Sequence, residues 1–199
     1  MDYKDKKNLF KVRKTVLEML ADRKYDVPEN FHISFEDFLL LLEENNLDIH
    51  LMKDGLKSIF VRFLYDFNKN VTKKDLDGFI EEIMGTTVDP NIHIILILKN
   101  NPSKNNLEML NKVENIEVFS FDYLCFNITK HILVPQHILL TEAEQEELFK
   151  KYRCTKAQLP KLPKTDRVAR YYGMQAGDVC KIIRKSPSMG EHIYYRHVR

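Results

Sequence analysis

An unbroken apolar run near the middle of the chain constrains the fold more than any other feature. Residues 92–98 read Ile-His-Ile-Ile-Leu-Ile-Leu, and Asn101 and Pro102 follow shortly after. The run is far shorter than the roughly 18 residues that cross a bilayer, and it fits a central β-strand covered on both faces. Strands of this kind occur in sheets with helices packed against them, so the run predicts an α/β module.

The segments around this run alternate between helical and strand patterns. Residues 59–65 and 116–121 are rich in β-branched and aromatic side chains, which predicts two more strands. A first helix is predicted from apolar residues at helical spacing, namely Leu9, Val12, Val16, Met19 and Leu20. Further helices are predicted after the potential N-caps Ser34, Thr72 and Ser103. The first part of the chain is therefore expected to form a small sheet flanked by helices.

A joint between two domains is predicted at residues 131–137. Pro135 blocks a helix there and biases Val134 toward an extended backbone. We therefore expect an N-terminal domain over residues 1–130, a linker over residues 131–137, and a C-terminal domain over residues 138–199.

The C-terminal part has helix signals first and strand signals last. Thr141 and Glu144 form a potential capping box that opens a helix ending near Tyr152. Thr165 or Asp166 can cap a second, short helix over residues 167–172.

Two segments close the chain, residues 179–184 and 192–196, and they predict an antiparallel hairpin. Such a hairpin leaves an edge strand that can pair with another chain. The expected class is α+β with a terminal β-hairpin.

Charge is unevenly distributed along the 199 residues, although the net charge is only +2. Residues 1–130 contain 18 Lys and Arg against 22 Asp and Glu, whereas residues 151–199 contain 12 basic and 3 acidic side chains. This asymmetry indicates an acidic partner, protein or nucleic acid, or else a solvated basic face. A disulfide framework or a four-ligand zinc site is not expected from three widely spaced cysteines, Cys125, Cys154 and Cys180.

Catalytic patterns are weak. A metal-dependent nuclease needs several carboxylates and a lysine at strand ends, but Asp66 and Lys99 have no acid-x-lysine pair beside them. His93 lies inside the apolar run, where a core histidine is the more common role. The six glycines form neither a phosphate loop nor a dinucleotide fingerprint. We expect a protein without catalysis, cofactor or metal.

A family resemblance appears in the C-terminal part. It is carried by five stretches in the family's order and spacing, residues 131–137, 158–160, 166–173, 177–184 and 194–196. These stretches resemble the assembly domain of the fifth subunit shared by eukaryotic nuclear RNA polymerases, which is equivalent to a small subunit of the archaeal enzyme. The chain departs from the family at Arg167, where proline is usual, and at Ala176, where a basic residue is frequent.

The N-terminal part resembles the eukaryotic subunit's jaw domain more loosely, through residues 11–25 and the strand at 92–98. The archaeal counterpart lacks this domain. The looser match suggests the hypothesis of a divergent lineage, such as a large DNA virus with its own polymerase. The expected location is the nucleus for a cellular protein, and host cytoplasm and virion for a viral one.

The resemblance implies a non-catalytic subunit of a hetero-oligomeric polymerase, with no membrane contact. Its C-terminal domain would dock on the largest subunit near other small subunits, and its jaw would lie beside downstream duplex DNA. Arginine and tyrosine are favoured interface anchors, which gives five candidate partner contacts: Arg170, Tyr171, Arg184, Tyr195 and Arg196. Weak phosphate contacts are expected from Lys73, Lys74 and Lys104.

Two alternatives stay open at this stage. Residues 151–199 could act as a freestanding basic nucleic-acid-binding module, which predicts tight and steeply salt-dependent binding by the isolated chain. A metal-dependent nuclease on the α/β half would instead lose magnesium-dependent cleavage in Asp66→Asn.

Overall fold

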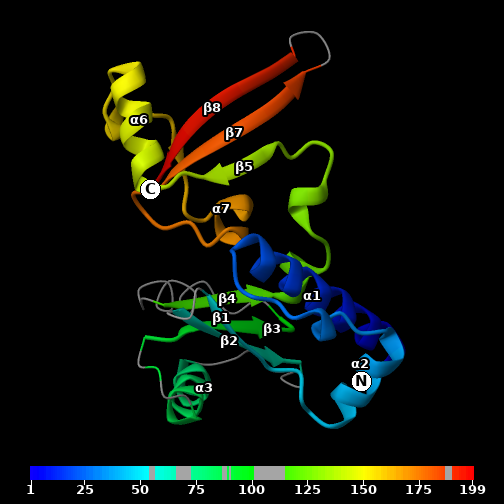
Figure 1. The fold of residues 1–199 in the computed structure, drawn as a ribbon. Coiled ribbons are helices and arrows are strands. Elements are labelled where there is room, and N and C mark those ends of the chain that lie inside the picture. Colours follow the sequence, from blue (N-terminus) through cyan, green and yellow to red (C-terminus); the bar gives the residue numbers. More distant parts are fainter. Residues whose placement is uncertain (54–56, 66–72, 87–88, 90, 101–114, 187–189) are drawn as a thin grey trace. The chain divides into compact units, whose positions relative to one another are not determined.

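The computed structural model describes residues 1–53, 57–65, 73–86, 89, 91–100, 115–186 and 190–199. The chain divides into two compact units, Met1–Phe126 and Asn127–Arg199 (Figure 1). This boundary differs from the one expected from the sequence. The second unit begins before residue 131, and the end of the expected linker, Gln136 and His137, is part of a strand rather than a connecting segment.

The first unit contains a four-stranded sheet in the order β1-β2-β3-β4. The strands are β1 (Ile49–Lys53), β2 (Lys57–Leu64), β3 (His93–Leu98) and β4 (Ile116–Ser120). β1 is antiparallel to β2, whereas β2, β3 and β4 run parallel to one another. The apolar run that dominates the sequence is thus an inner strand of a mostly parallel sheet, as predicted.

Helices cover both faces of this sheet. They are α1 (Tyr3–Asp22), α2 (Phe35–Glu43), α3 (Lys73–Thr86) and the short α5 (Phe121–Leu124), with a 3₁₀ turn at Glu29–Phe31. Ile83 of α3 packs with Ile94, Leu96 and Leu98, the alternate residues that share one face of β3. In Figure 1, α1 lies on the other face of the sheet. Coverage on both sides explains why β3 carries apolar residues without alternation.

The second unit has its own four-stranded sheet in the order β5-β7-β8-β6. Its elements are a 3₁₀ turn (Ile128–Lys130), β5 (Gln136–Leu139), α6 (Glu142–Tyr152), a 3₁₀ turn (Lys156–Gln158), β6 (Lys161–Leu162), α7 (Arg167–Tyr171), β7 (Val179–Ser186) and β8 (Gly190–Val198). β7 is antiparallel to both β5 and β8, and β6 runs parallel to β8.

Two small cores hold the second unit, one on each face of its sheet. Ala169 of α7 packs with Cys180, Ile182 and Val198 on one face. Leu148 of α6 packs with Val179 on the other face. Burial raises the pKa of the Cys180 thiol to about 11, which keeps it protonated at neutral pH and makes it a packing residue.

Local signals explain where α6 and α7 begin. The Thr141 side chain accepts a hydrogen bond from the Glu144 amide while the Glu144 carboxylate accepts one from the Thr141 amide, which confirms the capping box. For α7 the cap is Asp166, not Thr165, because its Oδ1 accepts from the amides of Val168 and Ala169. None of the described helices combines the length and the apolar character that a bilayer crossing demands.

Candidate interaction surfaces

The β7–β8 pair extends well past its neighbouring strands. It runs from the Val179–His197 pair to the Ser186–Gly190 pair. β5 covers β7 only between Cys180 and Ile183, and β6 covers β8 only at His197 and Val198. Within the described part of the chain, the outer edge of β8 from residue 190 to residue 196 therefore has no partner strand, which leaves backbone groups available to another chain.

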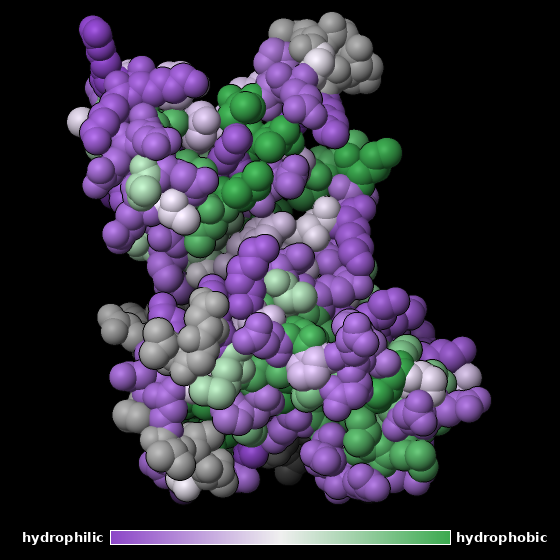
Figure 2. Space-filling view, in the orientation of Figure 1, coloured by the Kyte–Doolittle hydropathy of each residue, from purple (hydrophilic) through white to green (hydrophobic). Residues whose placement is uncertain are grey.

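Exposed apolar side chains lie on β8 and, separately, just before β5. Ile193 and Tyr194 of β8 are 50% and 51% exposed, and Ile132 and Leu133, which lead into β5, are 95% and 82% exposed. Hydrophobic side chains gather over this part of the second unit in Figure 2. Because a pair of adjacent, almost fully exposed branched side chains is unusual in an isolated domain, these residues indicate a surface that a partner covers. We call Ile193 and Tyr194 the apolar edge. Ile132 and Leu133 lead into β5, which borders β7 on the other side of the sheet, so they belong to a separate exposed apolar site.

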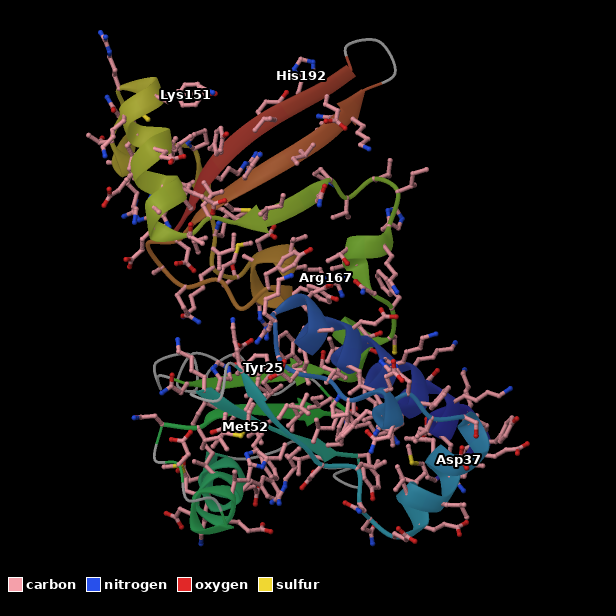
Figure 3. All side chains as sticks on the ribbon, viewed as in Figure 1. Tyr25, Asp37, Met52, Lys151, Arg167 and His192 are labelled. Atoms are coloured by element: carbon pink, nitrogen blue, oxygen red, sulfur yellow. The ribbon has the colours of Figure 1, made fainter. Side chains whose placement is uncertain are left out.

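The five predicted partner contacts do not form a single surface. Arg196 lies opposite Cys180, which packs against α7, so Arg196 is on the sheet face that α7 covers. Arg184 is on the same face, because it lies four residues after Cys180 in β7. In Figure 3 His192 marks the half of β8 that lies away from α7. Both arginines are exposed, and Arg170 of α7 is half-buried.

Tyr195 and Tyr171 stand apart from these arginines. Tyr195 projects from the α6 face, where its ring packs against Tyr152 at a centroid distance of 5.9 Å. Tyr171 is only 1% exposed, and its hydroxyl accepts a hydrogen bond from Asn127 Nδ2 at 2.9 Å. The expectation that Tyr171 contacts a partner is therefore wrong for this structure, because the ring fills the core of the second unit.

Only part of the lysine set expected to touch DNA phosphates falls within the described residues. Lys73 begins α3 and Lys74 is exposed in its first turn, whereas Lys104 lies outside the described residues. Of the two residues considered for a nuclease, only Lys99 is described. Asp66 lies outside the described residues, and Lys99 Nζ pairs with Asp5 of α1 at 2.8 Å. Among the described residues, no three His, Cys, Asp or Glu side chains are placed to hold a metal ion.

A buried charge cluster in the first unit was not foreseen from the sequence. Arg23, at the end of α1, donates from Nη1 and Nη2 to the two carboxylate oxygens of Glu117 on β4, each at 2.8 Å. His93 Nε2 of β3 lies 2.8 Å from Glu117 Oε1 without the alignment of a good hydrogen bond. The available signal in the sequence was a charged residue, Glu117, inside the mainly apolar predicted strand at residues 116–121.

Electrostatics in this cluster favour the ionised carboxylate. Burial alone would raise the pKa of Glu117, but the Arg23 guanidinium and His93 outweigh burial and hold that pKa at about 2. The cluster joins the end of α1 to β3 and β4. Arg23 and Glu117 satisfy each other and are only slightly exposed, so we assign the cluster a role in holding α1 on the sheet.

Comparison with known proteins identifies the class. The family model for the N-terminal domain of RNA polymerase Rpb5 matches residues 4–83, and that for the Rpb5 C-terminal domain matches residues 126–198. The second match starts within one residue of the second unit, which begins at Asn127. The two units together define a two-domain RNA polymerase subunit.

Full-length relatives support the same assignment. The chain is 34% identical to subunit rpabc1 of DNA-directed RNA polymerases I, II and III from Dictyostelium discoideum, over 96% of this chain and 98% of the relative. It is 30% identical to the Caenorhabditis elegans subunit RPABC1 over 96% and 95% of the two chains. It is 31% identical to subunit 5B of RNA polymerases IV and V from Arabidopsis thaliana, over 94% and 87%. The chain belongs to the Rpb5 family.

Proposed function

We propose that this chain is a non-catalytic common subunit of a multisubunit DNA-dependent RNA polymerase. The observation that carries the proposal is the collinear match of both units to the Rpb5 domains and to full-length polymerase subunits. Its partners are then the other subunits of that enzyme, with the largest subunit as the main contact and neighbouring small subunits beside it.

Docking is proposed to occur through the second unit. Its support is the coincidence of an unpaired strand edge, the apolar edge, and the exposed Arg184 and Arg196 on one hairpin. Interfaces commonly bury apolar groups at their centre and place arginine around them. A partner strand added to β8 would satisfy its free backbone groups while it covers Ile193 or Tyr194.

The first unit is proposed to act as a jaw beside downstream DNA. Residues 1–130 carry more acidic than basic side chains, so any DNA contact would be weak and made through phosphates. Lys73 and Lys74 at the start of α3, and Lys104, are the candidates for it.

The first test is a mild affinity purification of the tagged chain from its native cells, with mass spectrometry of the recovered proteins. The expected result is recovery of the two large polymerase subunits in near-equal amounts to the chain. Recovery of the chain alone, or with nucleic acid that salt removes, would overturn the subunit assignment. That second outcome would support a freestanding basic module built on residues 151–199.

A surface substitution tests the docking face within the same experiment. Ile193→Asp places a charge in the apolar edge and is expected to reduce co-purification of the largest subunit severely, because a desolvated carboxylate opposes binding. Leu40→Asp on α2 is the matched control, since Leu40 is 61% exposed but lies in the first unit. Equal recovery for the two variants would contradict docking through β8.

A further inference from the structure

A shallow, open basic hollow of about 570 Å³ lies in the second unit, where the 3₁₀ turn at Lys156–Gln158, β6 and the end of β8 meet. Three permanent cations line it, from Lys156, Lys161 and Arg199, together with His197. The remaining wall comes from small or apolar residues that include Ala157 and Ala176. We call this feature the cationic hollow.

No side-chain carboxylate in the described part of the chain pairs with a cation of the hollow. Among the described residues, no carboxylate forms an ion pair with Lys156, Lys161 or Arg199; the ion pairs of this unit join Lys150 to Glu146 and Lys185 to Glu191. Three positive charges facing one opening repel one another, so their arrangement favours an anionic occupant.

The acidic side chains of the surrounding sequence are engaged elsewhere. Residues 151–199 contain only three, Asp166, Asp178 and Glu191. Asp166 caps α7, Asp178 accepts a hydrogen bond from the Gln175 amide at 2.7 Å, and Glu191 pairs with Lys185. These three side chains therefore do not pair with the cations of the hollow.

Backbone hydrogen bonds fix the walls of the hollow before any ligand arrives. The Gly177 amide donates to the Val198 carbonyl at 2.9 Å, and the Val198 amide donates to the Asp178 carbonyl at 2.8 Å. Gly177 has φ +96°, which a side chain would strain, and Lys156 Nζ lies 4.0 Å from the position that a Cβ would take there. The backbone of the site therefore loses little order on binding, and the ordering cost falls on the lysine and arginine side chains.

We propose that the cationic hollow binds an acidic peptide segment of a protein partner, through two or more of its carboxylates. A single-stranded nucleic acid is less suited, because such sites place cations along a groove and stack bases on aromatic rings. The described lining of the hollow contains no Phe, Tyr or Trp ring, and its cations surround one opening. The hollow lies at the end of β8 away from Gly190, so the inference goes beyond the docking edge already described.

A peptide-binding measurement on the full chain tests this proposal. The probe is a fluorescent hexaglutamate peptide, followed by anisotropy at low salt, with hexaglutamine and a single-stranded DNA hexanucleotide as comparisons. The double variant Lys156→Glu, Lys161→Glu should weaken hexaglutamate binding by about tenfold or more, since it replaces two charge-assisted contacts by repulsion. The matched control is Lys150→Glu, Lys151→Glu on α6 (Lys151 is labelled in Figure 3), which changes the net charge equally outside the hollow and should leave binding nearly unchanged.

The outcomes separate cleanly. Equal weakening of hexaglutamate binding by the two double variants would show a diffuse attraction between the peptide and the basic surface, and would overturn the proposal. The proposal would also be overturned if hexaglutamate did not bind, or if the DNA hexanucleotide bound more tightly through the same lysines. An amide NMR titration of the unaltered chain needs no variant, and it should show its largest shifts around Gly177 and Val198. The readout uses the free chain, so failure of this inference leaves the recovery of polymerase subunits unaffected.

Discussion

Single residues in this protein show how burial changes the role of a side chain. Glu117 would be an ordinary surface acid by its type, but in the structure it receives two hydrogen bonds from Arg23 and sits beside His93. Tyr171 shows the same effect for a tyrosine that was expected at an interface. Its hydroxyl is bonded to Asn127, a residue that the sequence pattern assigned to the other domain.

Substitution of Glu117 by glutamine is expected to destabilise the first unit by about 3–5 kcal/mol, because it leaves the buried Arg23 guanidinium without its counter-charge. The control is Glu82→Gln, which removes a carboxylate that is 60% exposed and pairs with Arg62 at 3.0 Å. That change should cost no more than about 1 kcal/mol. Urea unfolding of both variants measures the difference, and equal costs would contradict the role given to the cluster.

The same residue predicts a pH dependence. The pKa of Glu117 lies at about 2 in the folded protein, below its ordinary value of 4.5, so the folded state favours the ionised form. The resulting stabilisation is fully present above pH 4.5 and is lost as the pH falls from 4.5 toward 2. Unfolding free energies across this window should decline more steeply for the unaltered chain than for Glu117→Gln. Parallel profiles would show that another acid controls the decline.

At the scale of elements, the sequence predicted the helices and strands that have long apolar patterns, but it did not predict the short strands that depend on pairing with a neighbour. α1, β2 and β3 were predicted because long apolar stripes or runs leave little choice of structure. β1 was missed because its five residues gain their extended form from pairing with β2. β6 has only two residues, which no pattern can distinguish from a loop. The helix predicted after Ser103 lies outside the described residues.

The cap of α7 is an element-scale prediction. Asp166→Ala removes the acceptor for the Val168 and Ala169 amides and should cost about 1 kcal/mol, within the usual range for a lost N-cap. Asp166→Asn keeps an oxygen acceptor and should stay within a few tenths of a kcal/mol of the unaltered chain. Thermal unfolding followed by circular dichroism compares the two. Equal losses would point to the charge of Asp166, and not its cap geometry, as the stabilising feature.

At the scale of the whole molecule, two-domain organisation was predictable, but the boundary was not. Pro135 suggested a joint at residues 131–137, whereas the second unit already includes residues from Asn127 onward. The apolar edge and the cationic hollow likewise could not be predicted from sequence patterns. Both depend on which strands remain uncovered and on how Lys156, Lys161 and Arg199 converge in space.

The boundary gives a prediction about fragments. A fragment of residues 127–199 contains both cores of the second unit, all four strands of its sheet, and the Asn127–Tyr171 hydrogen bond, so it should fold alone with a cooperative thermal transition. A fragment of residues 138–199 keeps α6, α7 and the hairpin but loses Gln136 and His137 from β5 and the hydrogen bond from Asn127 to the Tyr171 hydroxyl. Loss of that one hydrogen bond costs about 0.5–1.5 kcal/mol, and the shortened β5 adds to this cost in so small a domain. The shorter fragment should therefore melt at a clearly lower temperature or without cooperativity. Indistinguishable melting curves for the two fragments would place the boundary at residue 138 and return residues 127–137 to a connecting role.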